Sequence, residues 1–168
     1  MEKNTQIAIV LISESSLSLA RKISKEFPQS TIYTKSTLEG CEKISSYSQW
    51  TKEHFNDFKG IVFIGALGIC VRSIAGSVAH KYADPAVICV DSTGRFVITV
   101  LSGHVGGGNE WAQQIARSIG GEAVITAQSD NTNLWALDTL GQKYEWKTTA
   151  DHNAMNQAIF LFVNKNKT

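Results

Sequence analysis

The sequence predicts an α/β fold, a three-layer Rossmann-like sandwich whose mostly parallel sheet contains a β-hairpin and an antiparallel edge. Three observations predict it. Short β-branched runs alternate along the chain with segments of helical periodicity, as in βαβ units. Residues 60–64 (GIVFI) are apolar throughout, as expected of a central strand that is covered on both faces. Two β-branched runs, 86–91 and 95–101, are separated only by Ser92-Thr93-Gly94, a link of hairpin length.

Strands and helices alternate through the first half of the chain. Residues 6–12 (QIAIVLI) form a β-rich run, and residues 15–27 then place apolar side chains at helical spacing. Residues 66–75 follow Gly65 directly, so we expect a helix that begins at a glycine turn. The other elements expected in this half are a strand at 30–34, a helix at 38–57 and the strand at 60–64.

After the hairpin we expect one more helix and one more strand. Pro85 ends any helix that precedes the hairpin. Asn109 can cap a helix that runs to Ile119, and Gly120-Gly121 can end that helix. Residues 122–126 then predict the last clear strand.

The length and composition favour one domain. With 168 residues, of which 43% are hydrophobic, the chain can bury a core of its own, so we expect residues 1–168 to form a single α/β domain. The pattern is clearest over residues 60–130. Beyond it, residues 134–140 are expected to be helical and residues 158–163 fit either a strand or the end of a helix, which leaves open whether 131–168 form a subdomain.

Charge and hydropathy exclude several classes of partner. The formal net charge of +1 creates no general field for nucleic acid or anionic lipid. No apolar run approaches the roughly 18 to 20 residues that span a bilayer, and residues 1–6 are too polar to begin a secretory signal. We therefore expect a cytoplasmic protein with no membrane and no nucleic-acid partner.

The cysteines do not predict a metal site. Cys41, Cys70 and Cys89 are odd in number and lack CxxC spacing. We expect them to be reduced and mostly buried.

Ser102 to Asn109 (SGHVGGGN) is the most informative segment for function, because it places a hydroxyl, an imidazole and four glycines between a strand and a helix. Glycines let a ligand approach the backbone, and free N–H groups at a helix start attract carboxylate or phosphate oxygens. His104 is the titratable side chain of the loop and therefore the leading candidate for general acid or base. The alternative is that the glycines only form a tight turn while His104 binds a nearby carbonyl.

A second candidate segment is KYADP, which carries Lys81 and Asp84 just before a strand. If the hairpin forms, its second strand returns to the edge where the first began, which brings the glycine loop toward these two residues. Lys81 could then pair with a substrate carboxylate, and Asp84 could either orient His104 or cap a turn. The alternative is that both are solvated surface residues.

The third candidate segment is GALGICVR, in which Gly65 and Gly68 lead from a strand into a helix and Arg72 could bind a carboxylate. It lacks both GxGxxG spacing and the lysine and hydroxyl of a P-loop. An exposed helical arginine is the more common outcome. The hairpin geometry places this turn at the opposite edge of the sheet from the glycine loop.

Three blocks of the chain resemble the signature of one family. In order, they are GALGICVRSIAG, KYADPAVICVDSTGRFVITVLSGHVGGGNEWAQQIA and GGEAVITAQSD. These blocks resemble the N-terminal region of CbiG, the cobalt-precorrin-5A hydrolase family of cobalamin biosynthesis. The similarity covers residues 60–130 closely and the flanks weakly. It also implies a further C-terminal domain, which the 168 residues do not contain.

The resemblance implies a step of anaerobic vitamin B12 synthesis. A lactone on the ring of cobalt-precorrin-5A is opened and two carbons leave as acetaldehyde, giving cobalt-precorrin-5B, so the activity is that of a hydrolase acting on a carbon–carbon bond. The cobalt belongs to the substrate, and no cofactor or protein-bound metal is implied. The implied partners are the cobalt-corrinoid substrate and other pathway enzymes or a separate C-terminal domain, with a homo-oligomer left open.

The candidate residues are placed on this substrate by their chemistry. Its acetate and propionate groups suit cations and loop amides, and His104 suits proton transfer. The candidate catalytic residues are His104, Ser102 and Asp84. The candidate substrate-binding residues are Lys81, Arg72, Gly65, Gly68, Gly103, Gly106, Gly107, Gly108 and Asn109. Trp111, Trp135 and Trp146 either line a tetrapyrrole site or pack in the core, and we expect the core.

Two other functions stay open from the sequence. A binding module that holds a tetrapyrrole, or docks another enzyme, would explain the lack of an unmistakable pair of nucleophile and base. A nucleotide- or flavin-binding domain rests on fold analogy alone and is weakened by the missing fingerprints.

Overall fold

In the computed structural model the chain divides into two compact units, Met1–Val124 and Ile125–Thr168. The structure describes residues 7–80, 82–104, 106–126, 137, 144, 146, 147, 149 and 151–165. The first unit contains the sheet and every candidate site residue.

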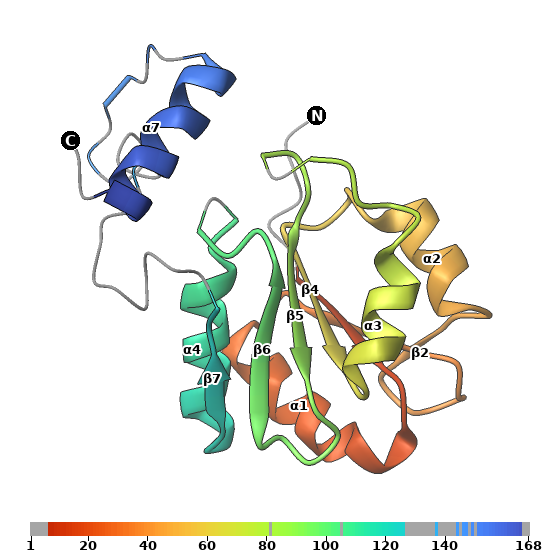
Figure 1. The fold of residues 1–168 in the computed structure, drawn as a ribbon. Coiled ribbons are helices and arrows are strands. Elements are labelled where there is room, and N and C mark those ends of the chain that lie inside the picture. Colours follow the sequence, from red (N-terminus) through yellow and green to blue (C-terminus); the bar gives the residue numbers. More distant parts are fainter. Residues whose placement is uncertain are drawn as a thin grey trace. The chain divides into compact units, whose positions relative to one another are not determined.

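The first unit is built on a seven-stranded sheet with the order β3-β2-β1-β4-β5-β6-β7 (Figure 1). The strands are β1 (Ile7–Leu11), β2 (Thr31–Thr34), β3 (Glu42–Lys43), β4 (Gly60–Ile64), β5 (Ala86–Val90), β6 (Phe96–Leu101) and β7 (Glu122–Val124). In the sheet order β3-β2-β1-β4-β5, each strand pairs in parallel with its neighbour. β5 and β6 pair antiparallel, and β7 is parallel to β6. The predicted mostly parallel sheet and its hairpin are therefore confirmed. The predicted antiparallel edge is formed by β6 and β7, which run opposite to the other five strands.

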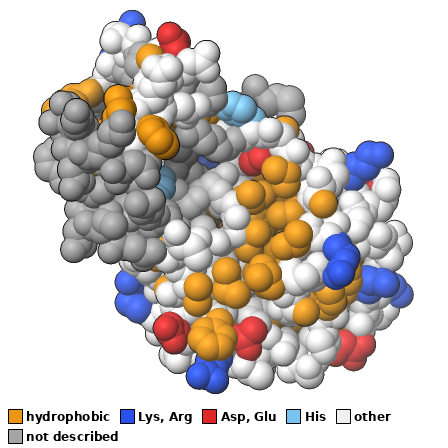
Figure 2. All heavy atoms as spheres, viewed as in Figure 1, with side chains coloured by type: hydrophobic (Ala, Val, Ile, Leu, Met, Phe, Trp, Pro, Cys, Tyr) orange, Lys and Arg blue, Asp and Glu red, His pale blue; other side chains and the backbone are white. Residues whose placement is uncertain are grey.

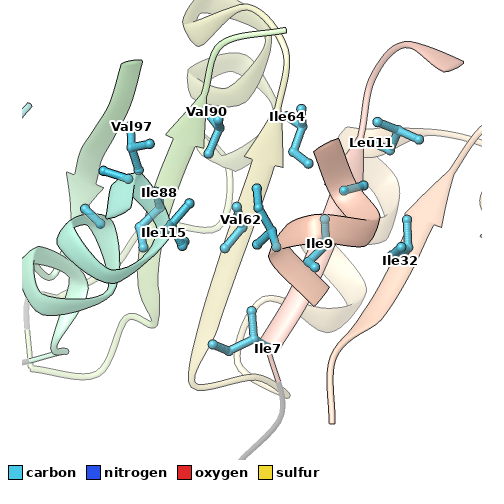
Figure 3. Packing of buried hydrophobic residues seen from close by; sticks show 14 residues of the cluster. Ile7, Ile9, Leu11, Ile32, Val62, Ile64, Ile88, Val90, Val97 and Ile115 are labelled. Carbon is cyan, nitrogen blue, oxygen red and sulfur yellow. The ribbon is translucent and has the colours of Figure 1, made fainter. Parts of the chain in front are cut away.

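Helices cover both faces of this sheet and complete the three layers. They are α1 (Leu17–Glu26), α2 (Tyr47–His54), α3 (Leu67–Ile74) and α4 (Gly108–Ile119), and a 3-10 turn at Glu14–Ser16 precedes α1. On one face, side chains of α1 and α4 pack on Ile9, Val62 and Ile88. Figure 3 shows Ile115 projecting from α4 toward this face. On the other face, Trp50 of α2 and Cys70 of α3 share a second buried cluster. β1, β4 and β5 are buried along their whole length because helices cover both of their faces.

The expected helix at 38–57 is wrong in its first half. Gly40 lies in the left-handed region with φ 74, and β3 follows it as a short edge strand. The helix begins only after Ser46, whose hydroxyl accepts the Gln49 N–H at 3.4 Å. A serine cap of this kind fixes the start of a helix against the periodicity that surrounds it.

The second unit contains α7 (His152–Lys165), so the helical alternative for residues 158–163 is the one observed. Most of the helix expected at 134–140 lies outside the described residues, as does Trp135. Trp111 packs against the core with its ring edge-on to Phe27 at 6.3 Å between centroids, as expected. Trp146 is 66% exposed, so the expectation of a core position is wrong for it.

Apolar side chains also remain on the surface of the first unit. Leu67 and Val71 of α3 are exposed, because this helix packs on the sheet through Cys70 and Ile74. Figure 2 shows hydrophobic side chains gathered on the face of the unit that carries α3 and β6. No helix among the described residues has both the length and the apolar composition needed to cross a membrane.

Asp91 closes the β5–β6 hairpin. Its carboxylate accepts the Phe96 N–H at 2.6 Å, the Thr93 N–H at 3.0 Å and the Thr93 hydroxyl. Partial burial by itself raises the pKa of Asp91, but these hydrogen bonds together outweigh burial and hold the pKa below its ordinary value. The ionised carboxylate therefore stabilises the turn.

Replacing Asp91 with Asn should reduce the dependence of stability on pH. Because the pKa is lower in the folded than in the unfolded state, Asp91 contributes its full stabilisation above the unfolded pKa of about 3.9 and loses it as pH falls through the folded pKa. In urea titrations from pH 6 to pH 3, the free energy of unfolding of the unaltered chain should fall more steeply than that of Asp91→Asn. Equal slopes would contradict the role of the ionised carboxylate.

Candidate functional site

The strands of the sheet start or finish at two opposite ends, which are called its two edges below. Two candidate segments meet at one of these edges. Asp84 precedes β5, and Ser102 follows β6. Because β5 and β6 run antiparallel, with Val87 opposite Leu101, the start of one strand lies beside the end of the other. The Ser102 hydroxyl donates to the backbone carbonyl of Asp84 at 3.1 Å. In Figure 1 both segments lie above the sheet, at the end opposite the β5–β6 turn.

The glycine loop between β6 and α4 is held together by its own backbone. Ser102 has a φ of 52, a left-handed conformation that is rare outside glycine. The hydrogen bonds of the loop are Gly106 N–H to Ser102 O (3.1 Å), Gly107 N–H to His104 O (3.1 Å), Gly108 N–H to Ser102 O (3.2 Å) and Asn109 N–H to Gly103 O (2.9 Å). These amides are therefore not the free anion donors that the sequence predicts, because the loop curls back and its carbonyls accept them.

The glycines are needed for the tight course of this loop. A Cβ on Gly103 would lie 2.5 Å from the Asn109 side-chain oxygen, and one on Gly106 would lie 2.7 Å from the Ser102 carbonyl oxygen. Gly107 has a φ of 76, which favours glycine. At these positions the structure matches the alternative reading of the glycines as a tight turn.

Asn109 does not cap α4, so that expectation is wrong. The cap position is Gly107, and the helix begins at Gly108. Asn109 lies within the first turn, 7% exposed, with its side chain against Gly103. The left-handed Gly107 lets the chain enter the helix two residues earlier than a side-chain cap at Asn109 would allow.

Asp84 caps a turn, which is one of the two roles expected for it. The residue is 8% exposed, and its carboxylate accepts the Ala79 N–H at 3.1 and 3.2 Å and the His80 N–H at 3.0 Å. The His80 carbonyl in turn accepts the N–H groups of Ala83 and Asp84, both at 2.9 Å. Ala79, His80, Ala83 and Asp84 are therefore closely bonded around a buried carboxylate, in what is called the capped turn below, and Ser102 joins this turn to the glycine loop.

His104 lies half-buried on the glycine loop. Its carbonyl accepts the Gly107 N–H, so the backbone that carries the imidazole is held in place. It is the titratable side chain of the sequence between Ser102 and Asn109. The loop that is joined to the capped turn therefore carries the imidazole.

The third candidate segment lies at the other edge. The Gly65 N–H donates to the Val90 carbonyl at 2.8 Å, which places Gly65 beside the end of β5. Gly68 and Arg72 are on α3, where the exposed Arg72 guanidinium donates to the Gly68 carbonyl at 3.3 Å. Five-residue strands separate the two edges by roughly 15 Å. These residues therefore do not share a pocket with His104, and Lys81 lies outside the described residues.

Sequence reasoning missed three residues at the first edge. His80 and Tyr82 are exposed on the capped turn, and their rings are 5.3 Å apart between centroids. Lys59 is an exposed cation at the start of β4, and its carbonyl accepts the Ala86 N–H at 3.0 Å. The signal for them was their position next to strand starts that share this edge.

The buried cysteines lie away from this edge, in the core. Cys70 of α3 and Cys89 of β5 are both buried, whereas Cys41 is only partly so. The hydrogen bond with Cys89, together with burial, raises the pKa of the Cys70 thiol, so this thiol stays protonated. Among the described residues, no group of three or more His, Cys, Asp or Glu side chains is placed to hold a metal ion.

Residues 49–130 match the family described as Cobalamin synthesis G N-terminal. The chain therefore carries the N-terminal domain of that family. This cobalamin synthesis G domain includes β4 to β7 and both segments of the candidate site.

Curated relatives extend the similarity beyond the cobalamin synthesis G domain. The chain is 34% identical over 147 residues to a cobalt-precorrin-5A hydrolase of Priestia megaterium, covering 83% of this chain and 39% of the relative. It is 35% identical over 141 residues to the cobalt-precorrin-5A hydrolase of Salmonella typhimurium strain LT2, covering 82% of this chain and 40% of the relative. The chain thus spans about two fifths of these relatives.

A solved structure shares the fold. It is a crystal structure of a cobalamin biosynthesis protein G homolog from Sulfolobus solfataricus, with a TM-score of 0.58 and 26% sequence identity. The match covers 72% of this chain and 36% of that chain.

Removing the Asp84 carboxylate should loosen the capped turn. Asp84→Ala leaves the N–H groups of Ala79 and His80 without their acceptor and should lower the free energy of unfolding by about 1–3 kcal/mol. Asp84→Asn keeps one acceptor oxygen and should lower it less. The matched control is Asp57→Ala, which removes an exposed carboxylate paired with His54 and should cost below about 1 kcal/mol. Equal losses for Asp84→Ala and Asp57→Ala in urea titrations would refute the capping role.

Proposed function

We propose that the chain is the corrinoid-handling N-terminal domain of a cobalt-precorrin-5A hydrolase. The proposal is carried by one observation: the region that matches the family contains both the capped turn at 79–84 and the glycine loop with His104. The relatives from Priestia megaterium and Salmonella typhimurium are named for this enzyme, and their similarity extends over more than four fifths of the chain.

The proposed reaction consumes one water molecule. Water opens the lactone at its C–O bond, a C–C bond then breaks, and cobalt-precorrin-5B and acetaldehyde are released. Both steps move protons near neutral pH, for which an imidazole is well suited. We assign this proton transfer to His104, because the loop holds its backbone next to the capped turn.

Ser102 and Asp84 take a positioning role in this proposal, in place of the catalytic role expected from the sequence. The Ser102 hydroxyl is bonded to the Asp84 carbonyl, and the Asp84 carboxylate is bonded to backbone N–H groups of its own turn. Both side chains therefore join the loop to the turn. They keep His104 in a fixed place relative to a substrate that rests on this edge.

A cation for the substrate carboxylates is available at the same edge. Lys59 immediately precedes β4, and Lys81, which follows His80 in the sequence, lies outside the described residues. In this proposal the cobalt arrives with the substrate, and the protein needs no metal or cofactor of its own. The reaction takes place in the cytoplasm, a reducing compartment that suits the free cysteines.

A second candidate function is a domain that binds the corrinoid without turnover. It is favoured by the contacts of Ser102, whose hydroxyl is bonded to a backbone carbonyl, and by those of Asp84 within its turn. Neither contact forms the pair of nucleophile and base that covalent catalysis uses. This alternative predicts binding of cobalt-precorrin-5A without acetaldehyde.

The two functions separate in one anaerobic assay. The purified chain is incubated with cobalt-precorrin-5A, binding is followed by absorbance, and acetaldehyde is measured with a coupled enzyme. We expect both binding and acetaldehyde. Binding alone would favour the holding domain. The absence of both binding and acetaldehyde would overturn the proposed function.

His104→Gln should lower the rate of acetaldehyde release by about 100-fold or more while binding changes little, because general acid–base catalysis contributes a factor of that size. The matched control is His54→Gln, which alters a partly exposed histidine of α2 and should leave the rate unchanged. Full turnover by His104→Gln would exclude this residue as the general acid or base.

A further inference from the structure

We propose that the His80–Tyr82 ring pair is the surface on which the flat face of the corrinoid ring stacks, with Tyr82 as the residue that determines this binding. The proposal rests on the proposed function, and it adds a binding surface to the site around His104. It is carried by the exposure of the two rings, the rigidity of the turn below them and their place beside the glycine loop.

The rings are exposed although they are large. Tyr82 is 38% exposed, and His80 is also exposed. Their planes are tilted by 40° with centroids 5.3 Å apart, so the two rings contact each other. A conjugated macrocycle is a large, flat partner with a π-face, which is the kind of group that such rings bind by stacking.

Hydrogen bonds hold the described backbone on either side of the two rings. The His80 N–H donates to Asp84, and the His80 carbonyl accepts the N–H groups of Ala83 and Asp84. The Tyr82 N–H donates to the His80 ring nitrogen Nδ1 at 3.3 Å, which ties the imidazole to the backbone next to Tyr82. A surface that is already ordered loses little entropy when it binds. The buried Asp84 carboxylate therefore serves to hold a surface that itself stays open to solvent.

The turn also lies beside His104's loop. Ser102 bonds directly to Asp84, only two residues from Tyr82. Ser102 adopts its unusual left-handed backbone at this contact. Strained backbone persists where surrounding structure enforces it, and it is concentrated at binding and catalytic sites. A ring stacked on Tyr82 would therefore have its periphery within reach of the loop that carries His104.

The test uses the full chain and cobalt-precorrin-5A as the probe, under anaerobic conditions. Absorbance titration gives the dissociation constant, and visible circular dichroism reports the asymmetric surroundings of the bound chromophore. Tyr82→Leu should raise the dissociation constant roughly five- to tenfold and weaken the induced dichroism, since it removes the ring. Tyr82→Phe keeps the ring and should bind within about twofold of the unaltered chain. Val71→Ala, which shortens an exposed apolar side chain of α3, is the control and should change neither readout.

The outcomes distinguish this proposal from the proposed function. No binding by the unaltered chain would overturn both. Binding by the unaltered chain and equally by Tyr82→Leu would overturn the stacking surface alone. A loss in Tyr82→Phe as large as that in Tyr82→Leu would also overturn it, because the hydroxyl rather than the ring would then be responsible. Far-ultraviolet dichroism of each variant verifies that the fold is kept.

Discussion

The reversal of the chain between β5 and β6 is the constraint on which the candidate site depends. In an all-parallel sheet, the segment after one strand and the segment before its neighbour lie at opposite edges. The antiparallel pairing of β5 with β6 instead brings the Asp84 turn and the Ser102 loop to one edge, where a single hydrogen bond joins them. Asp91 stabilises the reversal from the far end of the hairpin. The position of His104 thus depends on the β5–β6 turn, which lies a full strand length away.

The two joined segments are stabilised in different ways, the glycine loop by its backbone and the capped turn by a side chain. The glycine loop uses its own amides to close on itself, so its contribution is a fixed place for His104 and not an anion-binding cradle. In the capped turn, the buried Asp84 carboxylate binds the backbone N–H groups of Ala79 and His80, while the side chains of His80 and Tyr82 stay exposed. The buried Asp84 carboxylate is satisfied by N–H groups of its own turn, as the cost of leaving it unpaired demands. The side chains left facing solvent at this edge are therefore the ones available to a ligand.

Much of this arrangement follows from the sequence, because periodicity and turn residues act locally. The run GIVFI predicted β4 residue for residue, and the link at 92–94 predicted the hairpin and hence the meeting of Asp84 with Ser102. The failures concern choices between partners that only the folded backbone decides. A loop amide can bind either an anion or a carbonyl of the same loop. Which of these it binds depends on the left-handed conformation of Ser102, and a serine in the sequence does not predict that conformation. The exposure of Tyr82 likewise depends on the capped turn and not on its apolar character.

The central claim is that a corrinoid binds at the edge formed by the Asp84 turn and the His104 loop, and amide hydrogen exchange tests it most directly. Exchange is measured by mass spectrometry on the full chain with and without cobalt-precorrin-5A under anaerobic conditions. The ligand should slow exchange in peptides that cover residues 79–84 and 102–109 and leave residues 65–72 unchanged, since the latter lie at the opposite edge. Protection confined to residues 65–72 would place the ligand at the other end of the sheet and contradict the account.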